Sequence, residues 1–298
     1  MPNMHRLLRE QVRIQGQIAS GKRILRPKDD PAGAAISVVH DAEAARASQH
    51  VSNITAADAW VRITDAAMGE AVSVFERASE LAVAGADESK APGDLAALAE
   101  EVDGLLEHLL ALSETRYRGA AVFGGTKTED SPFAASRDAN GRITSVGFQG
   151  NGGPREIEVR RGVSLDIAVH GSDEAGGLGL PAFRDSTGYD AFQVLIDLRD
   201  HLAAGDASAA GTDVAEVEGA RAQISTARTA YGTVQTRLDL ARASQEEAEL
   251  TARTALDETA AVDVSEAAVE LAEYDAAYQA ALAVGTRIMQ ISLLDYLG

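Results

Sequence analysis

Apolar residues recur every seven positions along two long segments of this chain. The two series are Ile54, Val61, Met68, Phe75 and Ala82, and then Val217, Ile224, Tyr231 and Leu238. A seven-residue repeat places such side chains along one side of an α-helix, and that side must be buried against another helix. The repeat therefore predicts long helices that pack as a bundle.

Two further segments show helical patterns. After Pro92-Gly93, Asp94 is expected to cap a helix whose apolar stripe is Leu95, Leu98, Val102, Leu105, Leu109 and Leu112. A last helix is expected near 263–296, with Asp263 as its cap and Glu266 reaching back to it. Its apolar face is Val264, Ala267, Leu271, Tyr274, Tyr278, Leu282 and Ile288.

The middle of the chain differs from both arms. All seven prolines lie at or before Pro181, and fourteen of the 27 glycines fall within 119–190. Apolar residues alternate around Ile157 and Val163, which is the period of half-buried strands, and Asn140-Gly141 is a favourable two-residue hairpin turn. The sequence predicts a β-rich insertion between helical arms.

These patterns predict a mainly α fold with a β-rich insertion, in which both chain ends build a long helical bundle. The expected division has three parts. Residues 1–28 and 263–298 form a terminal helical pair, 29–130 and 189–262 form a rod-like bundle, and 131–188 form an inserted outer β domain.

Charge is unevenly distributed along the chain. The formal net charge is −19, yet residues 1–28 carry +6 and residues 263–298 carry −5. The overall acidity argues against nucleic-acid binding, which needs cations to displace counterions. The basic N-terminal helix could pair with the acidic C-terminal helix, which is the interpretation favoured here, or lie on an anionic membrane or act as a transit peptide. No apolar run is long enough to predict membrane insertion.

The sequence offers no positive sign of catalysis or of a cofactor. Cysteine is absent, and the six histidines are scattered without metal-ligand spacing, so neither a thiolate site nor a metal site is predicted. Gly124-Gly125-Thr126-Lys127-Thr128 lacks the full spacing of a phosphate loop and is interpreted as a turn. Asp29-Asp30 could be an acid/base pair, but the favoured interpretation makes Asp30 the cap of a helix that begins at Pro31.

Three blocks resemble a known family. Ile18 to Ala35, which contains Ser-Gly-Lys-Arg-Ile and then Asp-Asp-Pro-Ala-Gly-Ala, closely resembles the N-terminal signature of bacterial flagellins and their relatives. Val122 to Thr128 followed by Pro132-Phe133, and the ending Ser292 to Leu297, resemble the hook-associated type 3 branch of that superfamily, which forms the hook–filament junction. Nothing is matched within 134–188.

The resemblance implies a structural role. The expected protein is a non-enzymatic flagellar subunit, exported unfolded by the flagellar type III apparatus to the hook–filament junction outside the cell. Its implied partners are other copies of itself in a ring or helical turn, the first hook-associated protein, flagellin, and a cytoplasmic export chaperone on the C-terminal helix. A minor flagellin, a helical adhesin or signalling module, and an enzyme hidden in 131–188 remain the alternatives.

The resemblance also assigns residues to the family motifs and to assembly. They are Ser20, Gly21, Lys22, Arg23, Asp29, Asp30, Pro31, Phe123, Gly125, Leu271, Tyr278, Leu282, Leu293, Leu294, Tyr296 and Leu297. Family members usually carry a longer stretch before the first block, so a truncated N-terminal helix and a misassigned start both stay open. In either case the upper part of the C-terminal helix is expected to lack an N-terminal partner, and the terminal helices are expected to become fully ordered on assembly.

Overall fold

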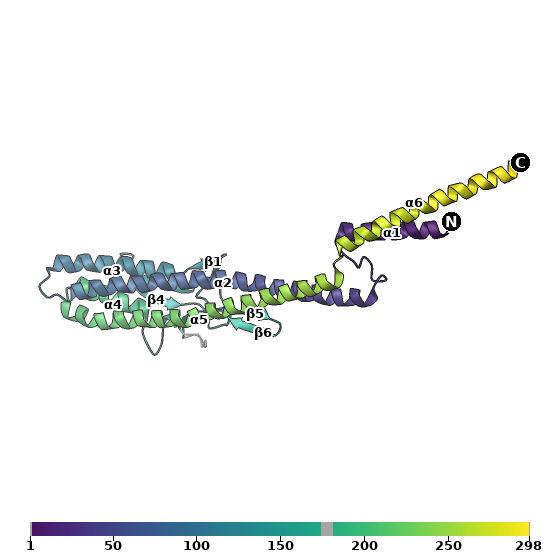
Figure 1. The fold of residues 1–298 in the computed structure, drawn as a ribbon. Coiled ribbons are helices and arrows are strands. Elements are labelled where there is room, and N and C mark those ends of the chain that lie inside the picture. The colour runs from purple at the N-terminus through teal and green to yellow at the C-terminus, as the bar shows by residue number, and fades with distance from the viewer. Residues whose placement is uncertain (1, 174–180, 298) are drawn as a thin grey trace. The chain divides into compact units, whose positions relative to one another are not determined.

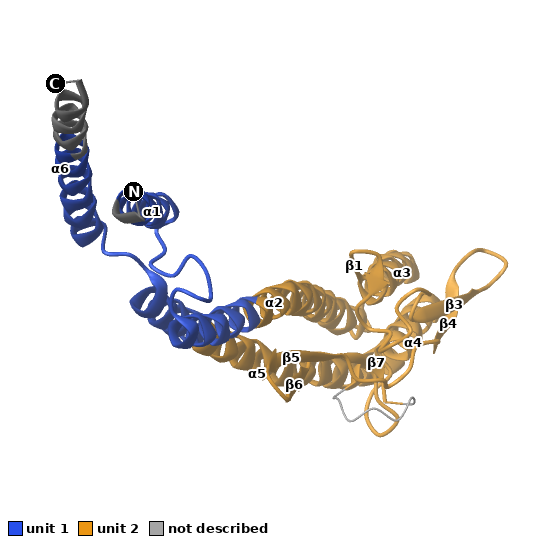
Figure 2. Cartoon of the chain, turned by 90° about the vertical axis from the view of Figure 1, so that its right-hand side faces the viewer, with its two compact units in different colours: residues 1–48, 246–298 blue, residues 49–245 orange. Residues whose placement is uncertain are grey.

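The computed structural model describes the backbone of residues 2–173 and 181–297, and the side chains of residues 4–173 and 181–284. The chain forms two compact units, shown in Figure 2. The terminal unit comprises residues 1–48 and 246–298, and the central unit comprises residues 49–245. Two long helices contribute to both units, and each unit is described by itself.

Helices dominate the described chain, as Figure 1 shows. They are α1 (Pro2–Ser20), α2 (Pro31–Gly85), α3 (Pro92–Ser113), α4 (Ala191–Ala204), α5 (Ala207–Ala260) and α6 (Val264–Leu297). At about 1.5 Å per residue, the 55 residues of α2 and the 54 of α5 each span roughly 80 Å. The prediction of long helices is confirmed.

The strands form four separate pairs between α3 and α4. They are β1 (Arg116–Tyr117), β2 (Ala120–Ala121), β3 (Phe133–Arg137), β4 (Ile143–Phe148), β5 (Glu156–Arg160), β6 (Val163–Asp166), β7 (His170–Ser172) and β8 (Pro181–Arg184). The first three pairs are antiparallel hairpins, whereas β7 and β8 run parallel. The predicted fold class, mainly α with a β-rich insertion, is therefore confirmed.

The seven-residue repeats form the core of the central unit. Ile54, Val61, Met68 and Phe75 on α2 are buried, and every member of the α5 series is buried as well. On α3 the burial is shifted, since Leu98 and Leu105 of the expected stripe are only partly buried while Leu106 and Leu110 are buried. An α-helix drifts away from a strict seven-residue repeat, which accounts for the shift.

Phenylalanines join the strands to α4. Four fully buried rings, those of Phe123, Phe133, Phe183 and Phe192, lie with neighbouring centroids 4.9–6.0 Å apart. Aromatic residues are only 4% of the chain, so these four rings are a local concentration that packs the core where the strands meet α4. The strands thus contribute to the same hydrophobic cluster as the helices of the central unit. The three-part domain division stays a prediction.

Two local expectations were wrong. Asp94 does not cap α3, because the helix begins two residues earlier, at Pro92, with Ala91 at the cap position and no side-chain cap. Proline has no backbone N–H, and the N–H groups of the first turn have no acceptor within the helix, so proline is favourable at this position. The turn at Asn140-Gly141 exists, but Asp138 pairs with Arg142, so the loop has three residues and Gly141 takes φ 88°.

Candidate assembly interface

A short backbone ladder closes the terminal unit. The segment that follows α1 pairs antiparallel with the segment between α5 and α6, with Lys22 opposite Ala261. The Arg23 amide donates to the Ala260 carbonyl at 2.7 Å, and the Val262 amide donates to the Gly21 carbonyl at 3.1 Å. We call these contacts the closure ladder. Gly21 has φ 69°, a left-handed conformation that ends α1 and that a residue with a side chain adopts only under strain.

Arg23 extends this closure to the start of α2. Its guanidinium donates to the Thr259 carbonyl at 2.8 Å and to the Asp30 carboxylate at 3.1 Å. Asp30 also accepts the Gly33 amide at 2.9 Å, as the cap of a helix whose first residue is Pro31. The hydrogen bond from the Gly33 amide has the larger effect on the pKa of the Asp30 carboxyl, and the hydrogen bond from Arg23 the next. Both hold that pKa below its ordinary value. The cap predicted from the sequence is confirmed, and Asp29 has a turn role through the Arg26 amide at 2.9 Å.

Charge and burial pair α1 with α6. Ile14 is fully buried in α1, and Ala267 is buried in α6. Gln11 donates to the Asp275 carboxylate, and Arg13 lies 3.8 Å from Glu270. The predicted pairing of the basic N-terminal helix with the acidic C-terminal helix is therefore confirmed.

Gln17 links this helix pair to the closure ladder. It is 7% exposed, accepts a hydrogen bond from Arg13 at 3.0 Å and donates to the Arg23 carbonyl at 2.5 Å. Sequence reasoning missed this residue, although a glutamine one turn after Ile14 on an apolar face was an available signal. Asp263 caps α6 as predicted, accepting the amides of Ser265 and Glu266 at 2.8 and 3.1 Å.

Large apolar side chains are exposed mainly on the terminal unit. Of fifteen exposed large hydrophobic residues among the described side chains, eleven lie there. They are Leu8, Val12, Leu25, Ile36, Val38, Val39, Leu250, Val264, Val269, Leu282 and Val284. Ile14 is the one large aliphatic side chain that the described part of this unit buries fully. The terminal unit therefore carries most of the large apolar side chains that are exposed among the described residues.

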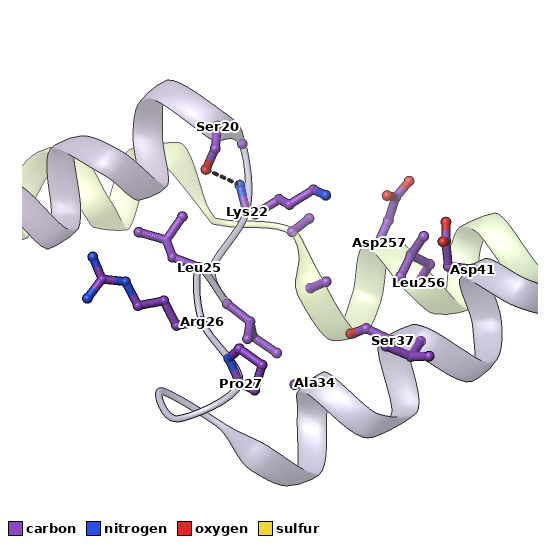
Figure 3. Close-up of a pocket in the computed structure, with 15 residues that line it drawn as sticks. Ser20, Lys22, Leu25, Arg26, Pro27, Ala34, Ser37, Asp41, Leu256 and Asp257 are labelled. Atoms are coloured by element: carbon purple, nitrogen blue, oxygen red, sulfur yellow. Dashed lines mark hydrogen bonds between the residues drawn. The ribbon is translucent and has the colours of Figure 1, made fainter.

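Part of this surface is hollowed. A pocket of about 480 Å³ lies between the segment that follows α1 and the adjoining ends of α2 and α5. Figure 3 shows Leu25 and Pro27 on the connecting segment, Ala34 and Ser37 on α2, and Leu256 on α5. Such a pocket suits an apolar side chain of a neighbouring protein better than a catalytic step, because its walls are mainly aliphatic.

The family-motif residues fall into three places. Ser20 to Arg23 and Asp29 to Pro31 form the closure of the terminal unit, while Leu271, Tyr278 and Leu282 lie on α6. Of these three α6 side chains, Leu271 and Tyr278 are partly buried and Leu282 is exposed. Four further residues were predicted to serve assembly, and their side chains lie outside the described part of the chain: Leu293, Leu294, Tyr296 and Leu297.

Phe123 and Gly125 belong to the central unit instead. Phe123 is fully buried, and Gly125 has φ 66° with no room for a Cβ against Asn151. The Lys127 amide donates to the Gly124 carbonyl at 3.2 Å, so the glycine-rich segment is a turn, as predicted. These two residues therefore pack the segment between β2 and β3.

The described residues contain no group of three or more metal-ligating side chains, and no described helix is long and apolar enough to cross a membrane. The observed chemistry of the terminal unit is that of packing, capping and backbone pairing.

Comparison with known proteins agrees with this geometry. Residues 2–128 match the family model of the bacterial flagellin N-terminal helical region. Flagellar hook-associated protein 3 of Escherichia coli is 31% identical over 122 residues, which are 41% of this chain and 38% of that protein. Polar flagellin F of Vibrio parahaemolyticus is 30% identical over 120 residues, which are 40% of this chain and 30% of that protein. The matched part thus spans less than two fifths of either relative.

A solved structure extends the likeness beyond the N-terminal half. Flagellar hook associated protein-3 from Legionella pneumophila has a TM-score of 0.60 at 15% identity, covering 74% of this chain and 98% of that chain. The chain therefore has a fold of the flagellin-like class, as the resemblance implied. Within that class, the predicted resemblance to the hook-associated protein of type 3 is confirmed.

Proposed function

We propose that this chain is a structural subunit of the bacterial flagellum, located at the junction between hook and filament, on which flagellin polymerises. The observation that carries the proposal is the terminal unit, which exposes eleven large apolar side chains on the charge-paired helices α1 and α6, on the segment after α1 and on the adjoining parts of α2 and α5. Burial of apolar area is worth about 25 cal/mol per Å², so a surface of this kind favours association with neighbouring subunits. The role is mechanical and needs no catalysis and no cofactor.

The proposed partners follow from the same surface and from the resemblance. Copies of the chain associate laterally, the first hook-associated protein lies on the hook side, and flagellin lies on the filament side. Before export, a cytoplasmic chaperone covers the apolar face of α6. Export through the flagellar apparatus delivers the chain to the outside of the cell.

Deletion of the gene tests the proposal. Loss of a junction subunit is expected to leave cells with hooks but without filaments, and with flagellin shed into the medium. Electron microscopy of the cells and immunoblots of the medium measure both effects, and re-expression of the full chain is the control. Filaments that persist in the deletion strain would contradict the junction role.

A minor flagellin is the second candidate, because polar flagellin F matches over nearly the same share of the chain as hook-associated protein 3. In that case the deletion leaves filaments attached, and antibodies to the chain label the filament rather than its base.

A further inference from the structure

A second concave site lies in the central unit, apart from the surface described above. A pocket of about 550 Å³ is lined by α2, the β1–β2 hairpin and β5. Trp60, Tyr117, Arg118 and Arg155 all line it. We call it the Trp60 pocket. Trp, Tyr and Arg are the residue types most enriched at the energetic centres of protein interfaces.

The aromatic residues of this pocket are packed against its cations. Trp60 is the one tryptophan of the chain, and its ring meets Tyr117 edge-on with centroids 6.2 Å apart. The Arg155 guanidinium lies 4.0 Å from the centroid of the Trp60 ring, and that of Arg118 lies 5.2 Å from the Tyr117 ring. Stacking of this kind holds a guanidinium in place while leaving its N–H groups free to donate.

The backbone at Arg118 is held in an unfavourable conformation. Arg118 has φ 52°, and it is the one residue other than glycine with positive φ among the described residues. It is followed by Gly119 at φ 86°, so a two-residue turn with both angles positive joins β1 to β2. Asn or Gly is the residue that such a turn prefers at this position. Strain of this kind persists typically where a side chain serves a function.

The two cations are also without carboxylate partners. Within the described part of the chain, neither Arg118 nor Arg155 forms an ion pair, although the chain has 46 acidic and 27 basic residues. Glu156 and Glu158 line the β5 side of the pocket, and Glu158 is engaged with the Gly162 amide at 3.0 Å. The Trp60 indole N–H likewise has no acceptor among the described residues.

We infer that the Trp60 pocket is a contact site for a second copy of this chain, and that it takes a carboxylate-bearing helix face of the neighbour against Arg118 and Arg155. A second copy fits because the chain is acidic over most of its length, and its helices therefore supply the charge that complements these two cations. The inference rests on the proposed self-association of the chain.

Photo-crosslinking in assembled flagella tests the inference. A photoreactive residue replaces Ala56, which is exposed and lines the pocket, so that Arg118 and Arg155 stay in place. Ala66, exposed on another side of α2, is the control position. Irradiation at Ala56 is expected to give a product of twice 31.1 kDa, joined to a segment of the second copy that contains Asp or Glu. The double variant Arg118→Gly, Arg155→Gln should lower the yield at least about fivefold, since two interfacial charges are lost.

The outcomes separate the inference from the function. If the chain is present in the flagellum but Ala56 crosslinks to a different protein, or gives the same yield in the double variant, the pocket is not the proposed contact and the junction role is unaffected. If no crosslink forms at Ala56 in flagella that contain the chain, the inference fails in the same way. If the chain is absent from flagella, both ideas fail together.

Discussion

Some residues of this chain have a backbone conformation that is unfavourable for their residue type. Arg118 is the sharpest case, because a residue with a Cβ in the left-handed region carries about 1 kcal/mol of strain or more. Arg161 offers a natural comparison, since it also precedes a glycine in a hairpin turn, yet its φ is not positive. The two arginines let strain be separated from charge.

Arg118→Gly is expected to raise the free energy of unfolding by about 0.5–1 kcal/mol, because glycine takes positive φ without strain. The matched variant Arg161→Gly is expected to lower the free energy of unfolding by about 0.5 kcal/mol, because at that position glycine only adds conformational freedom to the unfolded chain. Urea unfolding followed by circular dichroism measures both. Equal effects of the two variants would show that Arg118 carries no strain.

His201 makes stability depend on pH. Its Nδ1 lies 2.8 Å from the carboxylate of Asp213, which is 3% exposed, and this hydrogen bond raises the pKa of His201. A folded-state pKa above the unfolded value of about 6.5 means that the stabilisation is fully present below pH 6.5 and is lost as pH rises through the folded pKa.

His201→Gln should therefore remove a part of the unfolding free energy that is larger at pH 6 than above the raised pKa. The measurement is the urea midpoint of wild type and variant across this range. Burial lowers the pKa of His170, which acts in the opposite sense, but that residue is present in both proteins and cancels in the difference. His108→Gln on α3 is the control, and a wild-type advantage that grows with pH would refute the assignment.

At the scale of elements, buried polar contacts fix how α3, α4 and β4 meet. Arg199 on α4 is 3% exposed and donates to Asp103 on α3 at 2.9 Å and to the Ile143 carbonyl on β4 at 2.7 Å. A buried guanidinium with these partners orients three elements at once, because its loss breaks the pair with Asp103 and leaves the Ile143 carbonyl without its donor.

Arg199→Ala is expected to cost about 3 kcal/mol of unfolding free energy, since Asp103 and the Ile143 carbonyl are left without their buried donor. Arg228→Ala is the matched control, because Arg228 pairs with Asp65 on an exposed surface at 2.8 Å and its loss should cost about 0.5 kcal/mol. Chemical denaturation of both variants compares the two. Similar losses would mean that burial adds nothing at Arg199.

Across the whole molecule, the two units should differ in local stability. The central unit buries a large apolar cluster, whereas the described part of the terminal unit buries one large aliphatic side chain fully. Amide exchange on the isolated protein is therefore expected to be fast for Val264–Val284 and slow for Leu95–Leu112. Assembly should slow exchange in α6. Protection of α6 equal to that of α3 in the isolated protein would show that the terminal helices need no neighbours.

Sequence patterns predicted those parts of the fold that local chemistry decides. The Asp30 cap before Pro31, the Asp263 cap and the seven-residue repeats each leave a signal within one or two helical turns. The closure ladder left none, because backbone pairing does not depend on side-chain identity. Trp60 and Arg155 meet from segments far apart in the chain, and no periodicity records such a meeting. The shorter turn expected at Asn140-Gly141 failed because the same dipeptide also suits a three-residue loop.

The closure ladder also has a consequence for polypeptides that end early. The Arg23 guanidinium and the Thr259 carbonyl, which meet beside the ladder, are separated by 236 positions in the chain. A polypeptide that stops anywhere before that point contains the first half of the ladder and nothing to pair with it, whereas its central helices can still pack. Only a chain that extends as far as Val262 can form the ladder, so a chain that ends earlier lacks the pairing that closes the terminal unit.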